Sequence, residues 1–157
     1  MRRRRIYLGW PLSVFLVLAS VSGPLLAQSL TKDNFPEYLR ALENVDADAL
    51  KNRFFHEDFQ LQSGDKTMNL AELLEYEKSL KSLVDFHFEV KQIVADDAGI
   101  AMDAIETFDV KRDADVPNIG PAQAGERYEL HFNVFYGLTE GKISTINANL
   151  LSVRKLE

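Results

Sequence analysis

Residues 125–151, GERYELHFNVFYGLTEGKISTINANLL, decide the fold of this chain. Val, Ile, Tyr, Phe and Thr are frequent in both arms, and such residues fit the pleated, half-buried surface of a strand. Between the arms, Gly137 and Gly141 bracket the segment Leu138–Glu140. A loop of a few residues with Gly between two such runs is typical of a β-hairpin. We therefore expect two long strands joined by a short turn, with the rest of the chain covering their sheet.

The chain is more acidic than its net charge of −6 suggests, because four arginines lie at positions 2–5. Without residues 1–27, 14 basic residues stand against 24 acidic ones, a net charge of −10. A domain this acidic has no basic surface for nucleic acid and is repelled by anionic membranes. The chain has no Cys, which excludes disulfides, thiol nucleophiles and thiolate metal ligands. Its 157 residues suffice for one domain with one core.

Residues 1–27 have the order of a secretory signal. Arg2–Arg5 form a positive n-region, and an uncharged apolar run follows, densest at residues 12–21. We expect cleavage after Ala27, export to the periplasm or the medium, and one domain over residues 28–157. The alternative is an uncleaved membrane anchor, but the apolar run is short for a spanning helix and is interrupted by Gly and Pro. We expect no membrane contact after cleavage.

Helix signals come first along the remaining chain, and strand signals follow. Asp33 or Asn34 can cap a first helix and Asp46 a second, and Asn69 begins a third helix with the spacing of a capping box. On that third helix, Glu77 and Lys81 are spaced for an i,i+4 ion pair. Alternating apolar patterns predict strands within residues 55–62, 86–94 and 100–110.

Residues 111–124 separate these strands from the hairpin. They are charged and contain Pro117, Gly120 and Pro121, so we expect a long loop without regular structure, which is usually functional or mobile. Helices followed by a run of consecutive strands favour the α+β class with an antiparallel sheet.

Two segments in this order of elements carry a resemblance to a known superfamily: FFHED at residues 54–58 and LTEGKI at residues 138–143. The chain resembles the SnoaL-like branch of the nuclear-transport-factor-2-like superfamily, which includes polyketide cyclases and has limonene-epoxide hydrolase and ketosteroid isomerase as relatives. The resemblance covers residues 34–152. It implies a curved antiparallel sheet wrapped by N-terminal helices into a cone with an apolar pocket. Such domains often form homodimers through the outer face of the sheet.

The resemblance does not carry over the catalytic residues of those two enzymes. Tyr38 stands where ketosteroid isomerase-like enzymes place an oxyanion donor. The positions that would hold the other acids, bases and Arg of the two enzymes carry different residue types: Gln62 or Ser63, Asn133, Ile105, Thr107 and Ala148. The resemblance therefore implies the scaffold rather than either activity, and it implies no cofactor.

The functional question is which face of residues 129–136 looks into the cone. One face consists of Leu130, Phe132, Val134 and Tyr136, and the other of Glu129, His131, Asn133 and Phe135. Alignment to the epoxide hydrolase pattern turns the first face inward, and alignment to the isomerase pattern turns the second inward. Both cannot hold, because a one-residue slip moves every side chain to the opposite face. Burial of Leu, Phe or Val, worth roughly 1.5–3 kcal/mol each, favours the first face.

If the first face lines the pocket, the pocket walls are nearly all apolar and suit a small hydrophobic molecule. These ligand-binding candidates are Leu130, Phe132, Val134, Tyr136, Ile146, Ala148 and Leu150. If the second face lines it, His131, with an unperturbed pKa of about 6.5, is a candidate acid or base, and Asn133 can orient a carbonyl. Tyr38 as a donor and Asp103 as a buried carboxylate complete the catalytic candidates. Their structural alternatives are a core Tyr38 with a satisfied hydroxyl group and a surface His131 and Asp103.

No spacing in the sequence predicts a metal site, and His56 and His87 fit solvated positions. Three hypotheses follow. The domain binds a small hydrophobic molecule without converting it, or it is a cofactor-independent isomerase, cyclase, lyase or hydrolase that uses Tyr38 with His131, Asn133 or Asp103. The third, compatible with either, is that the sheet serves mainly as a dimerisation surface.

Overall fold

The computed structural model describes residues 29–63 and 66–157. The expected signal segment lies outside these residues. The described elements are α1 (Phe35–Glu43), α2 (Ala47–Ala49), η1 (Leu50–Phe54), β1 (Phe55–Ser63), β2 (Lys66–Asn69), α3 (Leu70–Leu83), β3 (Val84–Ala95), β4 (Gly99–Val110), β5 (Ala114–Val116), β6 (Gly120–Ala122), β7 (Arg127–Thr139) and β8 (Lys142–Leu156). None of the helices in these ranges is long and apolar enough to cross a membrane.

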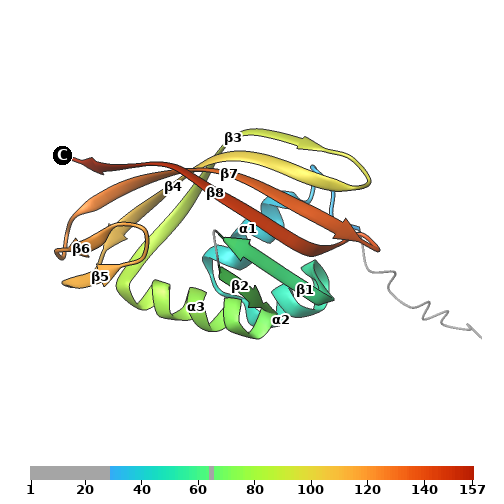
Figure 1. The fold of residues 1–157 in the computed structure, drawn as a ribbon, viewed down its shortest axis with the longest axis horizontal. Helices are drawn as coiled ribbons and strands as arrows, with labels where there is room; N and C mark the ends of the chain where they lie inside the picture. Colours follow the sequence, from blue (N-terminus) through green and yellow to red (C-terminus); the bar gives the residue numbers. More distant parts are fainter. Residues whose placement is uncertain (1–28, 64–65) are drawn as a thin grey trace, which may run out of the picture.

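The main sheet of the described residues has six strands in the order β2-β1-β8-β7-β4-β3. Figure 1 shows β3, β4, β7 and β8 as a long curved surface, with the helices gathered on one side of it. The predicted α+β class is confirmed. The prediction of an antiparallel sheet is wrong in one place, because β1 pairs with β8 in parallel. The helical segments α1, α2 and η1 precede β1, and β1 then enters the sheet beside β8 with the same strand direction.

The β7–β8 hairpin turns over two residues rather than the three expected. Thr139 pairs with Lys142, and the turn residues Glu140 and Gly141 have φ angles of 53° and 73°. Positive φ at both positions is the geometry of a type I′ turn, whose twist matches that of the strands. Gly137 lies inside β7, where an added Cβ would stand 2.3 Å from the Thr145 hydroxyl oxygen. The strands therefore continue past the glycine that the sequence suggested as a boundary.

The predicted helix caps are present at two of three positions. Asp46 accepts a hydrogen bond from the Ala49 amide, and Asn69 forms a complete capping box with Glu72. The predicted Glu77–Lys81 pair is replaced by another contact, because the Lys81 ammonium group donates to the Glu43 carbonyl oxygen at 2.6 Å. This contact fastens α3 to the end of α1 and leaves the Glu77 side chain free to point elsewhere.

Residues 111–124 are not the irregular loop that was expected. They form a small hairpin of β5 and β6, which Figure 1 places at one end of the sheet beside α3. Val116 is 1% exposed and Ala122 is 5% exposed. Burial of these side chains against the sheet explains why a segment rich in Pro and Gly is ordered.

The buried side chains form two clusters. The first joins α1, η1 and β1 to the turn end of the β7–β8 hairpin. The second joins the end of α3 and the β5–β6 hairpin to the start of β7. Tyr76 of α3 and Phe88 of β3 pack against both clusters and therefore connect them.

The segment before α1 is fastened to the β7–β8 turn. The Leu30 amide donates to the Gly141 carbonyl oxygen at 2.7 Å, and Leu30 is buried. A Cβ at Gly141 would lie 2.8 Å from the Ser29 Cα atom, while a Cβ at Gly125 would meet nothing within 4 Å. Both glycines have positive φ.

This pair of glycines gives a matched test of the contact. We expect Gly125→Ala to lower the free energy of unfolding by about 1 kcal/mol, the cost of a left-handed residue with a side chain. We expect Gly141→Ala to lower it by about 1–3 kcal/mol more, because the new methyl group overlaps the side chain and the Cα atom of Ser29. Urea unfolding of both variants measures the difference. Equal losses would show that the contact of Ser29 with the turn contributes nothing.

Candidate functional site

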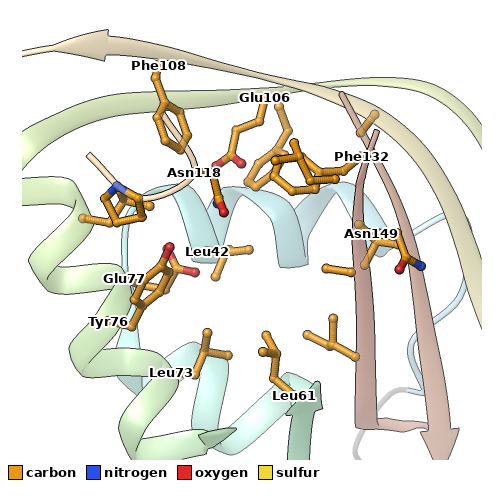
Figure 2. A pocket seen from close by; sticks show the side chains of 18 of the residues that line it. Leu42, Leu61, Leu73, Tyr76, Glu77, Glu106, Phe108, Asn118, Phe132 and Asn149 are labelled. Carbon is orange, nitrogen blue, oxygen red and sulfur yellow. The ribbon is translucent and has the colours of Figure 1, made fainter. Parts of the chain in front are cut away.

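A cavity of about 1160 Å³ lies under the curved sheet, between the two core clusters. Its lining comes from α1, α3, β1, β2, β3, β4, the β5–β6 hairpin, β7 and β8. Figure 2 shows these side chains surrounding an open interior, with Leu73 and Leu61 on the side opposite Glu106. Exposed lining residues, among them Lys66, Asn118 and Leu150, mark the side on which the cavity meets solvent.

The first face of β7 looks into this cavity. Phe132, Val134 and Tyr136 line it, together with Ile146, Ala148 and Leu150 of β8. Leu130 is on the same face but does not line the cavity. It is fully buried in the second core cluster beside the β5–β6 hairpin, so its prediction as a ligand contact is corrected to a core position.

The second face of β7 looks away from the cavity. The Nε2 atom of His131 lies 2.5 Å from Oδ1 of Asp103 on the neighbouring strand β4, and each side chain is 37% exposed. Asn133 is exposed on the same outer face and pairs with Asp103 across the strands. Since Tyr38 lines the cavity and these three residues lie on the outer face, the structure does not bring Tyr38 together with His131, Asn133 or Asp103 in one site.

Tyr38 of α1 is fully buried at the inner end of the cavity. Its ring packs edge-on against Tyr136 with the centroids 5.5 Å apart. Burial is the main reason that the pKa of Tyr38 lies well above its ordinary value. Both phenols therefore stay protonated and can donate a hydrogen bond to a ligand.

Two carboxyl groups that were not predicted from the sequence enter the cavity from two different elements. Glu106 projects from β4 and Glu77 from α3. Glu106 is 9% exposed and is the one buried charged residue among the described residues. Burial raises the pKa of Glu77 to about 7. Burial raises the pKa of Glu106 well above its ordinary value too, with further contributions from the charges of Glu77 and Glu43.

Other polar groups stand around this pair. Tyr76 precedes Glu77 on α3, and both side chains line the cavity (Figure 2). Burial raises the pKa of the Tyr76 phenol to about 12, and the charges of Glu77 and Glu106 add to the shift. Asn118 of the β5–β6 hairpin and Asn149 of β8 contribute amide groups to the lining. The cavity thus combines apolar walls with a small set of acids and donors.

The sequence did contain a signal for both glutamates. Glu106 falls in the apolar alternation Ile100, Met102, Ala104 and Phe108 of β4, so its side chain must share their inward face. Glu77 is four residues after Leu73 and three before Leu80, both buried on α3, which places it on the same helix face. A carboxylate on a core-facing position of each element is the pattern that predicts an acidic site inside the cone.

No group of three or more His, Cys, Asp or Glu residues in the described ranges could hold a metal ion. His87 instead pairs with Glu43, with Nδ1 and Oε1 2.8 Å apart. His56 accepts a hydrogen bond from the Asp58 amide at 3.2 Å. Neither histidine lines the cavity.

Comparison with known proteins places the fold. No protein-family model matches the sequence, and no curated protein sequence matches it. Among solved structures, a SnoaL-like polyketide cyclase from Agrobacterium tumefaciens is 19% identical, with a TM-score of 0.62 over 76% of this chain and 90% of that one. An LEH-like epoxide hydrolase from M. tuberculosis is 14% identical, with a TM-score of 0.58 over 76% of this chain and 80% of that one.

A third structure is a hypothetical protein from Catenulispora acidiphila with a ketosteroid isomerase-like fold, in complex with trimethylamine. It is 10% identical, with a TM-score of 0.57 over 76% of this chain and 86% of that one. These matches show the fold: the chain has the nuclear-transport-factor-2-like fold, which the SnoaL-like polyketide cyclase shares. Proteins that share this fold include cyclases and hydrolases, so the matches support the scaffold and not a particular activity.

The raised pKa of Glu77 predicts a pH dependence of stability. The folded state holds a proton on Glu77 up to a pH of about 7, whereas the unfolded chain releases it near the ordinary value of a glutamate. The folded state therefore binds more protons over this interval, and the free energy of unfolding falls as the pH rises through it.

Replacement of Glu77 by Gln removes this penalty. We expect Glu77→Gln to unfold at a higher free energy than the parent protein at pH 8, by on the order of 1–3 kcal/mol, and with little difference at pH 4. Glu89→Gln is the matched control, because Glu89 is an exposed residue paired with Lys91 on β3. Denaturation at both pH values checks this. A gain that is the same at pH 4 and pH 8 would contradict the raised pKa.

Proposed function

We propose that this protein is an exported domain that binds a small hydrophobic molecule in the cavity under its sheet. The observation that carries the proposal is the inward face of the β7–β8 hairpin, where Phe132, Val134 and Ile146 form an apolar wall on a cavity of about 1160 Å³. Pockets that bind small molecules are mostly apolar concave sites of this order of size, with a few polar groups that orient the ligand.

The polar groups of the cavity support binding in one orientation. Glu77, Glu106 and the Tyr38–Tyr136 pair lie deep in the cone or on its walls, whereas Lys66 and Asn118 are exposed lining residues. A ligand with one polar end and an apolar body therefore matches the distribution of side chains. Its polar end would meet the carboxyl groups, and its body would contact the Phe and Val side chains.

Two further properties belong to this proposal. Export rests on the signal-like order of residues 1–27. Homodimerisation through the outer face of the sheet rests on exposed apolar side chains there, with Phe135 48% exposed and Val94 59% exposed. Phe135 and Val94 both lie near Ala101 across the strands, so they form one patch.

A cavity-filling pair of variants tests ligand binding. Ala148 faces the cavity, and Asn147 is exposed on the outer face of the same strand. The purified protein is screened with sterol-like, terpenoid and aromatic compounds by thermal unfolding. A ligand at a hundred times its Kd stabilises the folded state by about 2.7 kcal/mol, which raises Tm by several degrees. We expect Ala148→Phe to abolish this shift and Asn147→Phe to retain it.

The proposal fails if no compound raises the Tm of the parent protein and a crystal structure shows the cavity filled by its own side chains. It also fails if both variants keep the same shift, because the ligand would then bind outside the cavity.

A second candidate function is cofactor-independent acid–base catalysis on a small hydrophobic substrate, as in an isomerase, cyclase, lyase or hydrolase. The specific observation in its favour is the pKa of Glu77, about 7, because a general base works best when its pKa lies near the working pH. Glu106 and Tyr38 supply a neutral acid and a phenol donor in the same cavity. In this reading Glu77 removes a proton next to a carbonyl group, and Tyr38 donates a hydrogen bond to the oxygen.

Proton exchange at carbonyl compounds distinguishes catalysis from binding alone. We expect the protein in D₂O to accelerate deuterium uptake next to the carbonyl group of cyclic ketones, as measured by NMR. We expect Glu77→Gln to reduce the rate by about 10²–10⁴-fold, the usual contribution of a general base, and Glu89→Gln to leave it unchanged. A rate equal to that of buffer for every ketone bound would exclude the catalytic function and leave binding in place.

A further inference from the structure

The cavity holds an acid without a partner. Glu106 is more than nine-tenths buried, and its carboxyl group points into the open interior in Figure 2. Among the described residues its carboxyl group makes no salt bridge and no side-chain hydrogen bond, and its oxygens face the cavity space. A buried carboxyl group without a partner is costly, and such groups usually pair with a cation or stay neutral.

Glu77 is a second carboxyl group in the same space. It enters the cavity from α3, beside the wall that carries Glu106 on β4 (Figure 2), and the two are close enough that the charge of Glu77 raises the pKa of Glu106. Lys66 is the one basic residue among the described lining residues. It is exposed and forms no salt bridge within the described part of the chain, so the protein supplies no counter-charge at the pair.

The surroundings of the pair are aromatic. Tyr76 stands next to Glu77, and Phe88 and Phe108 line the same part of the cavity as Glu106. Phe88 pairs with Glu106 across β3 and β4. Aromatic faces attract cations, and the attraction is stronger where water is excluded. Carboxylates and aromatic rings around one space form a typical recognition site for an ammonium group.

We propose that the ligand of this cavity is an organic cation, a hydrophobic amine or ammonium compound whose charged nitrogen lies between Glu77 and Glu106. This inference rests on the proposed function of small-molecule binding and specifies its ligand class. A cation offsets the repulsion between the two carboxylates, whereas a neutral ligand leaves it in place and an anion adds to it.

Binding of a cation is coupled to release of protons from the pair. The titratable groups that face Glu106 are Glu77 and Tyr76 from α3, Glu43 from α1 and Tyr136 from β7. Lys66 and Asp115 line the cavity farther out. The pKa of Tyr76 and that of Tyr136 are raised, so both phenols stay neutral, and the glutamates are the groups that ionise. The affinity for a cation therefore increases as the pH rises through about 7, where Glu77 loses its proton.

Three adamantane compounds of nearly the same shape test the assignment. 1-Adamantylamine is a cation, 1-adamantanol is neutral and adamantane-1-carboxylate is an anion. Titration calorimetry on the protein at pH 6 and pH 8 measures all three. At pH 8 we expect the amine to bind at least about tenfold more tightly than the alcohol, since one charge-assisted contact contributes that much, and the carboxylate to bind most weakly. We expect the preference for the amine to shrink at pH 6.

Variants then assign the preference to the pair. We expect Glu106→Gln to reduce the affinity for the amine by about tenfold and to leave the affinity for the alcohol nearly unchanged. Glu89→Gln, which replaces an exposed glutamate on β3, should change neither. The comparison of amine and alcohol on the parent protein does not depend on whether a variant folds.

The outcomes separate the ligand class from the binding function. Equal affinity for amine and alcohol at pH 8, or a compound screen in which only neutral molecules bind, overturns the cation assignment and leaves hydrophobic binding in place. If neither the adamantanes nor any compound in the wider screen binds, both the assignment and the proposed function fail.

Discussion

The register of the β7–β8 hairpin is the constraint on which the rest of the structure depends. A two-residue turn with positive φ at Glu140 and Gly141 sets the pairing of Thr139 with Lys142. The alternation of side chains then places Val134 and Tyr136 under the sheet and His131 above it. β4 pairs along the full length of the other edge of β7, so the same alternation passes to β4. The turn, together with two bulges in the pairing, between His131 and Phe132 and between Gly137 and Leu138, thus decides which residues reach the cavity.

Local sequence patterns predict part of this fold, and contacts between distant segments determine the rest. The α+β class, the cap at Asn69 and the long C-terminal hairpin follow from local patterns that the structure confirms. The parallel pairing of β1 with β8 could not be predicted in this way, since it depends on how the preceding helices pack rather than on either strand. The β5–β6 hairpin was missed for a related reason. Its order comes from the burial of Val116 and Ala122 against distant elements, and no local pattern in a Pro- and Gly-rich segment reports that.

In the candidate site, the informative residues are those that break the local pattern. Apolar alternation identified the inward face of β4, and Glu106 was passed over because it breaks that alternation. Stability alone favours an apolar residue at a core-facing position. A charged residue at such a position departs from this preference, and such departures concentrate at functional sites. Here the departure occurs twice, on β4 and on α3, and the two residues meet in the same cavity. Asp103 attracted attention as a mid-strand acid, but its own alternation places it outside with His131.

The β5–β6 hairpin separates two tasks within the molecule. Glu77 and Glu106 stand on α3 and β4, elements held by both core clusters, and cannot change position without disturbing the fold. Asn118 and Ile119 come from the connection between two three-residue strands, which pair only with each other. Sequence drift in that short excursion could reshape access to the cavity while the acids beneath it stay fixed. The rim of the cavity is therefore free to change in sequence while the two carboxyl groups keep their places on the rigid core.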